Sequence, residues 1–421
     1  EEMNLSDLYK TYSRIRKNQA TPAQLLKIVL YAAMNNIYSS RRIESACKRG
    51  INFMFLLDGA PAPDHATIAR FIAIHLNACP RRIMSEMDKI LYHLGEISAR
   101  DIFIDGTKIE SVANKYTFVW KRAVTKNLAK LIDKVLVLVK DCEDNYGLRI
   151  VHNNQVSLHT LKRMRKKLYK VKNDAGIAFV HGIGKRKTAI QKSIELTEHY
   201  TGKLQEYVAK LHKCGSRNSY SKTDKDATFM HMKEDYMRNG QLKPGYNIQA
   251  AVESEYIVGI DVSAERSDMR TLIPFLDKLN RNFGRNFNNL IADAGYESEE
   301  NYLYLRSHNM TSYIKPVNYE QSKKRNFRTK YGRPENMEYH EMGDIFVCKA
   351  GRILWRVGTK HEKSKTGFVS EKAMYRCESC EGCPYKQNCT KAKGDKTHSV
   401  SHRFRELRKE SQEYITTEFG R

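Results

Sequence analysis

Two aspartates stand at the ends of short hydrophobic segments, where carboxylates can hold metal ions. Asp105 closes the segment 101–105 and Asp293 closes the segment 289–293. Carboxylates at the ends of neighbouring buried strands can share two Mg²⁺ or Mn²⁺ ions about 4 Å apart, one activating a nucleophile and one stabilising the leaving oxygen. Taken singly, each aspartate is better explained as a cap of the following turn. Taken together, the pair favours a two-metal site.

Four of the nine cysteines cluster near the end of the chain as Cys377-x2-Cys380-x2-Cys383-x5-Cys389. Four thiolates at this spacing predict a tetrahedral structural Zn²⁺ site. Disulfides are the alternative, which a cytosolic setting opposes, and iron–sulfur ligation is a looser match. We interpret the remaining five as reduced, buried thiols of a cytoplasmic protein: Cys47, Cys79, Cys142, Cys214 and Cys348.

The charge balance predicts a polyanionic partner. The 421 residues include 73 Lys and Arg against 48 Asp and Glu, a formal net charge of +25, which is more than solubility requires. The length suggests about three domains. No apolar run approaches the roughly 20 residues that span a bilayer, and no secretory signal opens the chain. We therefore expect neither a membrane-spanning nor a secreted protein.

The first 97 residues have helical periodicity throughout. Thr21 to Gln24 reads as a capping box with proline at the first helical position, and Asp64 can cap a later helix. Short helices joined by tight turns favour a DNA-binding module of the helix-turn-helix kind over a plain helical bundle, because the chain is basic. The candidate DNA contacts here are Arg41, Arg42, His65 and Arg70.

The middle of the chain changes from a strand to long basic helices and back. Residues 121–215 predict a helical insertion, with Ser157 and Thr188 as caps, the second in a capping box with Gln191. Asp224 and Asp226 are interpreted as first-turn residues of a following helix. Further candidate DNA contacts are Lys108, Lys185, Arg186 and Lys187.

Strands and helices then alternate. Segments 246–252 and 256–262 predict a hairpin. The elements expected after it are a helix over 271–281, a strand over 289–293, a helix over 299–307, a strand over 312–316 and a last helix from about Arg403. In the strand over 101–108, Ile102 and Ile104 should face one side, and Phe103 and Asp105 the other.

Five segments resemble one known family. Residues 104–111 and 291–298 are similar to the first two catalytic motifs of bacterial insertion-sequence transposases of the Asp-Asp-Glu (DDE) type, and 63–71, 218–227 and 271–275 are similar to other recurring stretches of that family. The resemblance covers essentially the whole chain. It implies that Asp105 and Asp293 are the first two catalytic carboxylates.

The resemblance also implies a multi-domain α/β fold, with a ribonuclease H-like mixed sheet, flanking helices and an all-α N-terminal domain. The expected parts are a DNA-binding domain (1–97), a catalytic domain in two segments (98–120 and 216–340), the basic helical insertion (121–215), a cysteine-cluster subdomain (341–395) and a C-terminal helix (396–421). The implied partners are double-stranded DNA of the element's terminal inverted repeats and a second copy of the chain, at the bacterial nucleoid.

The family's third carboxylate is a glutamate on a late helix. The last helix offers Glu406, Glu410, Glu413 and Glu418, but none stands in the expected sequence context, and only three residues follow Glu418. We therefore expect a chain cut short before the third carboxylate, with Glu418 as a weaker alternative. The rival functions are a catalytically inactive DNA-binding remnant and an unrelated Mg²⁺ nuclease.

Overall fold

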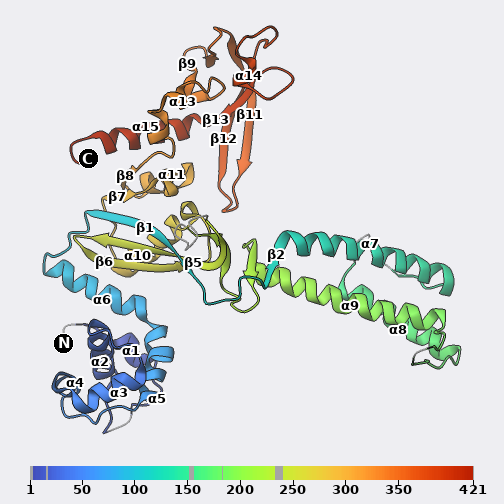
Figure 1. The fold of residues 1–421 in the computed structure, drawn as a ribbon, viewed down its shortest axis with the longest axis horizontal. Coiled ribbons are helices and arrows are strands. Elements are labelled where there is room, and N and C mark those ends of the chain that lie inside the picture. Colours follow the sequence, from blue (N-terminus) through green and yellow to red (C-terminus); the bar gives the residue numbers. More distant parts are fainter. Residues whose placement is uncertain (1–2, 16–17, 151–155, 183, 233–239, 421) are drawn as a thin grey trace. The chain divides into compact units, whose positions relative to one another are not determined.

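The structure is a computed structural model that describes residues 3–15, 18–150, 156–182, 184–232 and 240–420. The chain divides into two compact units. The first comprises Glu1–Gly106, Ile248–Asp261 and Ser267–Arg421, and the second comprises Thr107–Asn247 and Val262–Arg266. The helices and sheets of the whole chain make it a mixed α/β protein (Figure 1).

The first unit opens with a cluster of short helices around its own apolar core. They are α1 (Ser6–Lys10), α2 (Pro22–Met34), α3 (Ser40–Arg49), α4 (Ile51–Leu57), α5 (His65–Arg70) and the π-helical stretch η1 (Phe71–Leu76). The predicted capping box at Thr21 and Gln24 is present, and Asp64 caps α5 by accepting the N–H of Thr67. The caps satisfy backbone donors that a helix start otherwise leaves unpaired.

Within the described residues the main sheet has six strands: the order is β4–β5–β1–β7–β8, with β4 at Thr228–His231, and β6 also pairs with β5. Its other strands are β1 (Asp101–Glu110), β5 (Leu242–Glu253), β6 (Tyr256–Ser263), β7 (Asn289–Ala292) and β8 (Thr311–Ile314). β1, β7 and β8 are parallel neighbours. β5 and β6 form the predicted hairpin, whose two turn residues, Ser254 and Glu255, both have positive φ, as a type I′ hairpin turn requires.

Helices cover this sheet. They are α6 (Pro80–His93), α10 (Leu272–Phe283), α11 (Glu299–Ser307) and α15 (His402–Thr416). Pro274 stands in the first turn of α10, where the missing N–H costs no helical hydrogen bond. α15 packs against β8 and α11, and its Ser411 hydroxyl donates to the carbonyls of Ser312 and Ile314 at 3.0 and 2.9 Å.

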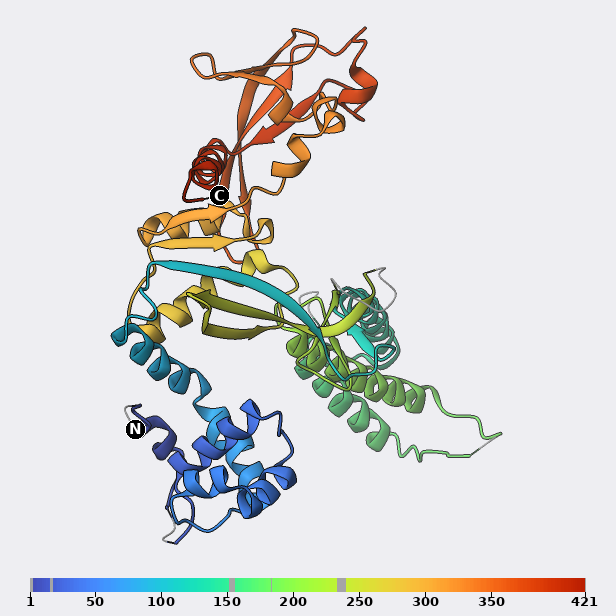
Figure 2. The ribbon, with the colours of Figure 1, turned by 60° about the vertical axis from the view of Figure 1, so that its left-hand side comes forward.

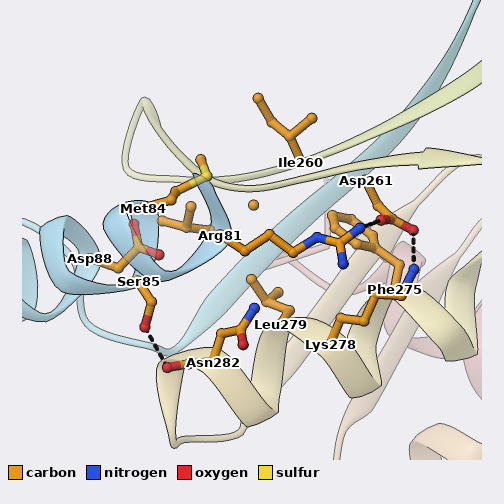
Figure 3. A pocket seen from close by; sticks show the side chains of 12 residues that line it. Arg81, Met84, Ser85, Asp88, Ile260, Asp261, Phe275, Lys278, Leu279 and Asn282 are labelled. Carbon is orange, nitrogen blue, oxygen red and sulfur yellow. Dashed lines mark hydrogen bonds and ion pairs between the residues drawn. The ribbon is translucent and has the colours of Figure 1, made fainter. Parts of the chain in front are cut away.

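An ionic cluster holds α6 against the sheet and α10 (Figure 3). The Asp261 carboxylate accepts hydrogen bonds from Arg81 of α6 and from Lys278 of α10, the latter at 2.7 Å. Asp88 borders the same pocket, is 2% exposed and has no hydrogen-bond partner for Oδ1. Burial raises the pKa of Asp88 to about 7, because an apolar setting disfavours the charged form.

A second, antiparallel sheet follows in the first unit (Figure 2). Its order is β13–β12–β11–β10–β9, and its strands are β9 (Glu338–His340), β10 (Ile345–Val347), β11 (Ile353–Lys363), β12 (Val369–Cys377) and β13 (Thr397–Val400). The short helices α12 (Tyr319–Ser322), α13 (Arg325–Arg328), η4 (Pro334–Asn336) and α14 (Lys386–Cys389) accompany it. Phe346, Leu354 and Tyr375 form its buried centre.

Among its described residues, the second unit contains three helices and short strands. They are α7 (Lys121–Tyr146), α8 (Leu158–Asp174), α9 (Ala189–Cys214), β2 (Phe118–Trp120), β3 (Ser219–Ser221) and β4 (Thr228–His231). α9 packs against both α7 and α8 (Figure 1). Ser157 and Thr188 cap α8 and α9 as predicted, but the Gln191 side chain bonds to Val180, so the box expected at Thr188 does not form.

Asp224 and Asp226 do not start a helix within the described residues, and that prediction was wrong. β4 follows instead, and Asp224 accepts hydrogen bonds from the hydroxyls of Tyr246 and Ser111. The Asp224 carboxylate therefore binds residues distant in the sequence, although its local sequence pattern predicted that it starts a helix. Within the described residues, no helix is long and apolar enough to cross a bilayer.

Candidate active site on two adjacent parallel strands

Asp105 and Asp293 are held at the same level of two adjacent parallel strands. Ile104 of β1 pairs with Ala292 of β7, and the two aspartates are the next residues. Asp293 follows the end of β7 as expected, but Asp105 does not end its strand, because β1 continues to Glu110. Neighbouring strands lie about 4.8 Å apart, so the two carboxylates share one edge of the sheet. Both side chains are exposed, whereas Ile102 and Ile104 are buried, which confirms the predicted alternation.

Each aspartate also bonds to the turn that follows it. Asp105 Oδ1 accepts the N–H of Gly106 at 2.7 Å, and Asp293 Oδ1 accepts the N–H of Gly295 at 2.8 Å. The capping alternative is therefore present in the structure. Each of these bonds uses one carboxylate oxygen and leaves the other free to bind a metal ion. The bond therefore fixes the side chain at the sheet edge without preventing metal binding.

A third carboxylate that sequence reasoning missed lies beside this pair. Asp268 belongs to the short 3₁₀ segment η2 (Asp268–Arg270), and Asp293 starts the next one, η3 (Ala294–Tyr296). A Cβ atom placed on Gly295 would stand 2.9 Å from Asp293 Oδ1 and 3.2 Å from Asp268 Oδ2. The two carboxylates therefore border the same small volume. The signal in the sequence was an aspartate in the short loop between a strand and the next helix.

A buried polar network contacts Asp268, the third carboxylate. Tyr296 is fully buried and its hydroxyl donates to Gln249 Oε1, while Gln249 Nε2 donates to Asp268 Oδ1 at 3.3 Å. Burial and then the negative charges of Asp268, Asp105 and Asp293 raise the pKa of Tyr296 above its usual range. Tyr296 therefore stays a neutral hydrogen-bond donor.

The described residues contain no group of three or more His, Cys, Asp or Glu side chains already arranged to hold a metal ion. The carboxylate pair nevertheless has the oxygen donors that Mg²⁺ and Mn²⁺ prefer, at an exposed edge where further positions stay open. The donor chemistry thus fits a divalent metal.

Two glutamates of α15 have cationic neighbours, and Glu418 lies beyond the end of α15 at Thr416. Glu410 is paired with Arg306, and Glu413 lies 3.8 Å from Lys409. Glu418 adjoins Phe419, whose ring packs against Tyr313 and lies 5.5 Å from the Arg100 guanidinium. Arg100 precedes β1 and stands five residues before Asp105, roughly 16 Å along an extended strand. In this conformation Glu418 belongs to the opposite end of β1.

The predicted DNA contacts fall into two classes. Arg41, Arg42, Arg70, Lys185 and Arg186 are exposed, and no ion pair of theirs is seen within the described chain. The other three already have partners. His65 bonds to Glu44 through both its backbone N–H and Nδ1, Lys187 pairs with Glu195, and Lys108 donates to the carbonyl of His231.

The four clustered cysteines border one pocket, together with a fifth. Cys377, Cys380, Cys383 and Cys389 line it, and so does Cys348. The interpretation of Cys348 as an isolated buried thiol was therefore wrong, because it is half-buried and faces the cluster. Cys380 Sγ accepts the N–H of Lys396 at 3.2 Å, and Asp395 accepts the N–H of Cys380.

Three family models match the chain. A model described as "Transposase domain (DUF772)" matches residues 1–73, and two described as "Transposase DDE domain" match residues 217–376 and 347–421. Asp293 and Asp268 lie inside the matched stretches, whereas Asp105 lies outside them. The chain belongs to the DDE insertion-sequence transposases. No curated protein and no solved structure matches it.

A DDE transposase is a polynucleotidyl transferase and endonuclease that binds DNA, and its family generally uses Mg²⁺ or Mn²⁺. The family matches at both ends of this transposase agree with the resemblance of its motifs. They assign no role to any single residue, so Asp105 and Asp293 remain predicted catalytic residues.

Proposed function

We propose that this transposase catalyses metal-dependent strand cleavage and strand transfer at the ends of an insertion sequence. The observation that carries the proposal is the register of β1 and β7, which brings Asp105 and Asp293 to one exposed sheet edge. The pairing of the two strands alone brings together two carboxylates that are 188 positions apart in the sequence, as a two-metal site needs.

We assign this edge to a ribonuclease H-like catalytic domain. A hairpin, β5–β6, joins a parallel set, β1–β7–β8, with β1 in the centre. Helices α10 and α11 connect successive strands, and α15 packs on β8. This strand order supports the assignment, because it sets the two predicted catalytic strands side by side in the middle of the sheet.

Asp105 and Asp293 would hold the metal, with Asp268 beside them. Bound Mg²⁺ or Mn²⁺ would supply Lewis-acid activation of the nucleophile and stabilisation of the leaving oxygen. The chain's own part is to fix the carboxylates. The Gly106 and Gly295 N–H groups hold one oxygen of each aspartate, and the neutral Tyr296 hydroxyl holds Gln249, which in turn bonds to Asp268.

We also propose that the cysteine pocket holds a structural Zn²⁺. The support is the convergence of the four clustered thiols with Cys348 on one pocket, and an N–H donor already directed at Cys380 Sγ. Because the thiols are not preformed as a metal site, binding would draw them together and stabilise the loops that carry them.

The test is a nicking assay on duplex DNA that carries the terminal inverted repeats flanking the coding sequence. The transposase should cut it with Mg²⁺ or Mn²⁺, and Asp105→Asn and Asp293→Asn should each lower the rate by several orders of magnitude, because ligands of one site act as a unit. DNA binding should persist. Asp133→Asn, an exposed carboxylate on α7, is the matched control and should cut normally.

Two results would contradict the proposal. Cleavage that survives both substitutions would remove Asp105 and Asp293 from catalysis. Tight DNA binding with no cleavage by the unaltered chain would favour one of the two expectations that deny it activity, a missing third carboxylate or a catalytically inactive DNA-binding remnant.

A further inference from the structure

Helix α8 in the second unit carries an unusual excess of positive charge. Its 17 residues include seven Lys and Arg and a single Asp. The neighbouring helices are nearly balanced, with six cations against four acids in α7 and four against three in α9. The net charge of the insertion therefore resides mainly on one helix.

Five of the seven cations of α8 occupy one side of the helix. Thr160, Leu161, Met164 and Leu168 are buried against the rest of the unit. At 100° per residue, a helix with this buried stripe presents His159, Lys162, Arg163, Lys166, Lys167 and Lys170 together on another face. We call these six residues the basic face of α8. Lys162, Arg163, Lys166 and Lys170 are exposed.

No ion pair to a carboxylate neutralises the basic face within the described chain. The ion pair that α8 does make joins Arg165, on another side of the helix, to Glu198 at 3.7 Å. A solvated surface helix usually offsets its cations with acids three or four residues away. The only acid of α8 is Asp174, its last residue, which has this spacing to Lys170 alone among the basic face. The charge is thus unbalanced locally as well as in total.

Part of the basic face forms a pocket. Arg149, His159, Arg163 and Lys167 line it, with Thr160 and Met164 behind them. Lys167 Nζ donates to the carbonyl of Arg149, which ties the segment after α7 to α8. His159, Arg163 and Lys167 repeat every four residues, about 6 Å along the axis each. All the titratable groups that line this pocket are cationic or neutral, which suits an anion.

We propose that the basic face of α8 is a binding surface for the phosphate backbone of duplex DNA. The row from His159 to Lys167 is about 12 Å long, and each DNA strand presents a phosphate about every 3.4 Å along the helix axis, so the row can engage several phosphates. The inference rests on the proposed function, since it names one surface through which the transposase holds its DNA. Such contacts position the duplex and carry no sequence information themselves.

The test compares two triple substitutions in the full chain by fluorescence anisotropy with a labelled duplex over a series of salt concentrations. Lys162→Gln/Lys166→Gln/Lys170→Gln removes three charges from the basic face. Lys126→Gln/Lys130→Gln/Lys134→Gln removes three exposed charges with the same spacing from α7. Both sets lie at the surface, so circular dichroism and thermal unfolding should match those of the unaltered chain.

The α8 triple should reduce the slope of log K against log salt by about 2–3, since each phosphate left without its cation lowers the slope by about 0.9. The α7 triple should change it by less than about one. A second variant, Arg163→Gln/Lys167→Gln, should reduce the slope by about 2 if both pocket cations meet phosphates.

Equal reductions from the two triples would overturn the inference, because only total charge would then matter. An unchanged slope in the α8 triple, with salt-dependent binding by the unaltered chain, would also overturn it while leaving the proposed function standing. An unaltered chain that shows no salt-dependent binding to DNA would overturn both.

Discussion

Asp268 approaches Gly106 so closely that a Cβ atom on Gly106 would stand 2.6 Å from Asp268 Oδ1. The same atom would also stand 2.6 Å from Gln249 Nε2 and 3.0 Å from the Tyr296 hydroxyl. Gly106 directly follows Asp105, the first predicted catalytic residue. The network of Asp268, Gln249 and Tyr296 packs against this glycine. The glycine is required here for close approach, not for its φ angle.

Gly106→Ala should therefore disturb the site. The added methyl group must displace Asp268 and Gln249, and overpacking of this kind costs about 1–3 kcal/mol. We expect a lower unfolding temperature and a larger loss of cleavage rate than the stability change explains. Gly202→Ala on α9 is the control, because nothing lies within 4 Å of its Cβ. A Gly106→Ala chain with normal cleavage would show that the network is not needed.

Asp88 predicts a pH dependence of stability. Its folded pKa of about 7 lies above the ordinary value of 3.8, so the folded state binds the proton more tightly than the unfolded chain. The stabilisation is complete below about pH 4 and is lost as the pH rises through 7. Asp88→Asn should raise the unfolding temperature at pH 8, by an amount equivalent to about 1–3 kcal/mol, and by much less at pH 5. A benefit that is the same at both pH values would contradict the buried-charge explanation.

Arg408 of α15 neutralises a buried carboxylate on the sheet side. Glu297 is 3% exposed, and Arg408 meets it with two hydrogen bonds, at 2.6 and 3.1 Å. Arg408→Met should cost about 3–5 kcal/mol in urea unfolding, because it leaves the buried Glu297 carboxylate without a cation. The double variant Arg408→Met/Glu297→Gln should recover part of that stability. No recovery would mean that Arg408 acts through packing alone.

The zinc proposal has a direct measurement. Protein purified under reducing conditions should contain about one zinc per chain, and Cys380→Ser should lose the metal and loosen the loops around the second sheet. Cys142→Ser, in the core of the second unit, should keep the zinc even if it lowers stability. Absence of zinc from the unaltered chain would refute the site.

Local patterns in the sequence were sufficient for most elements of the sheet and for the faces of β1. The alternation of Ile102 and Ile104 with Phe103 and Asp105 has a period of two, and burial follows it directly. α11 spans Glu299–Ser307 as predicted, and the caps at Thr21 and Asp64 formed because they need only residues within one turn. The motifs also indicated the family, which the family models then confirmed.

Tertiary structure decided how distant segments meet. Sequence spacing alone could not predict that Asp268 lies beside Asp293 or that Cys348 lines the cysteine pocket. It could not predict the hydrogen bonds of His65 with Glu44 and of Tyr246 with Asp224 either. Each of these contacts joins residues at least 21 positions apart, and a side chain's local pattern carries no record of which remote partner will neutralise or bury it. Short-range periodicity therefore determined the strands and helices of this transposase, while strand pairing and packing determined which carboxylates, thiols and cations share a site.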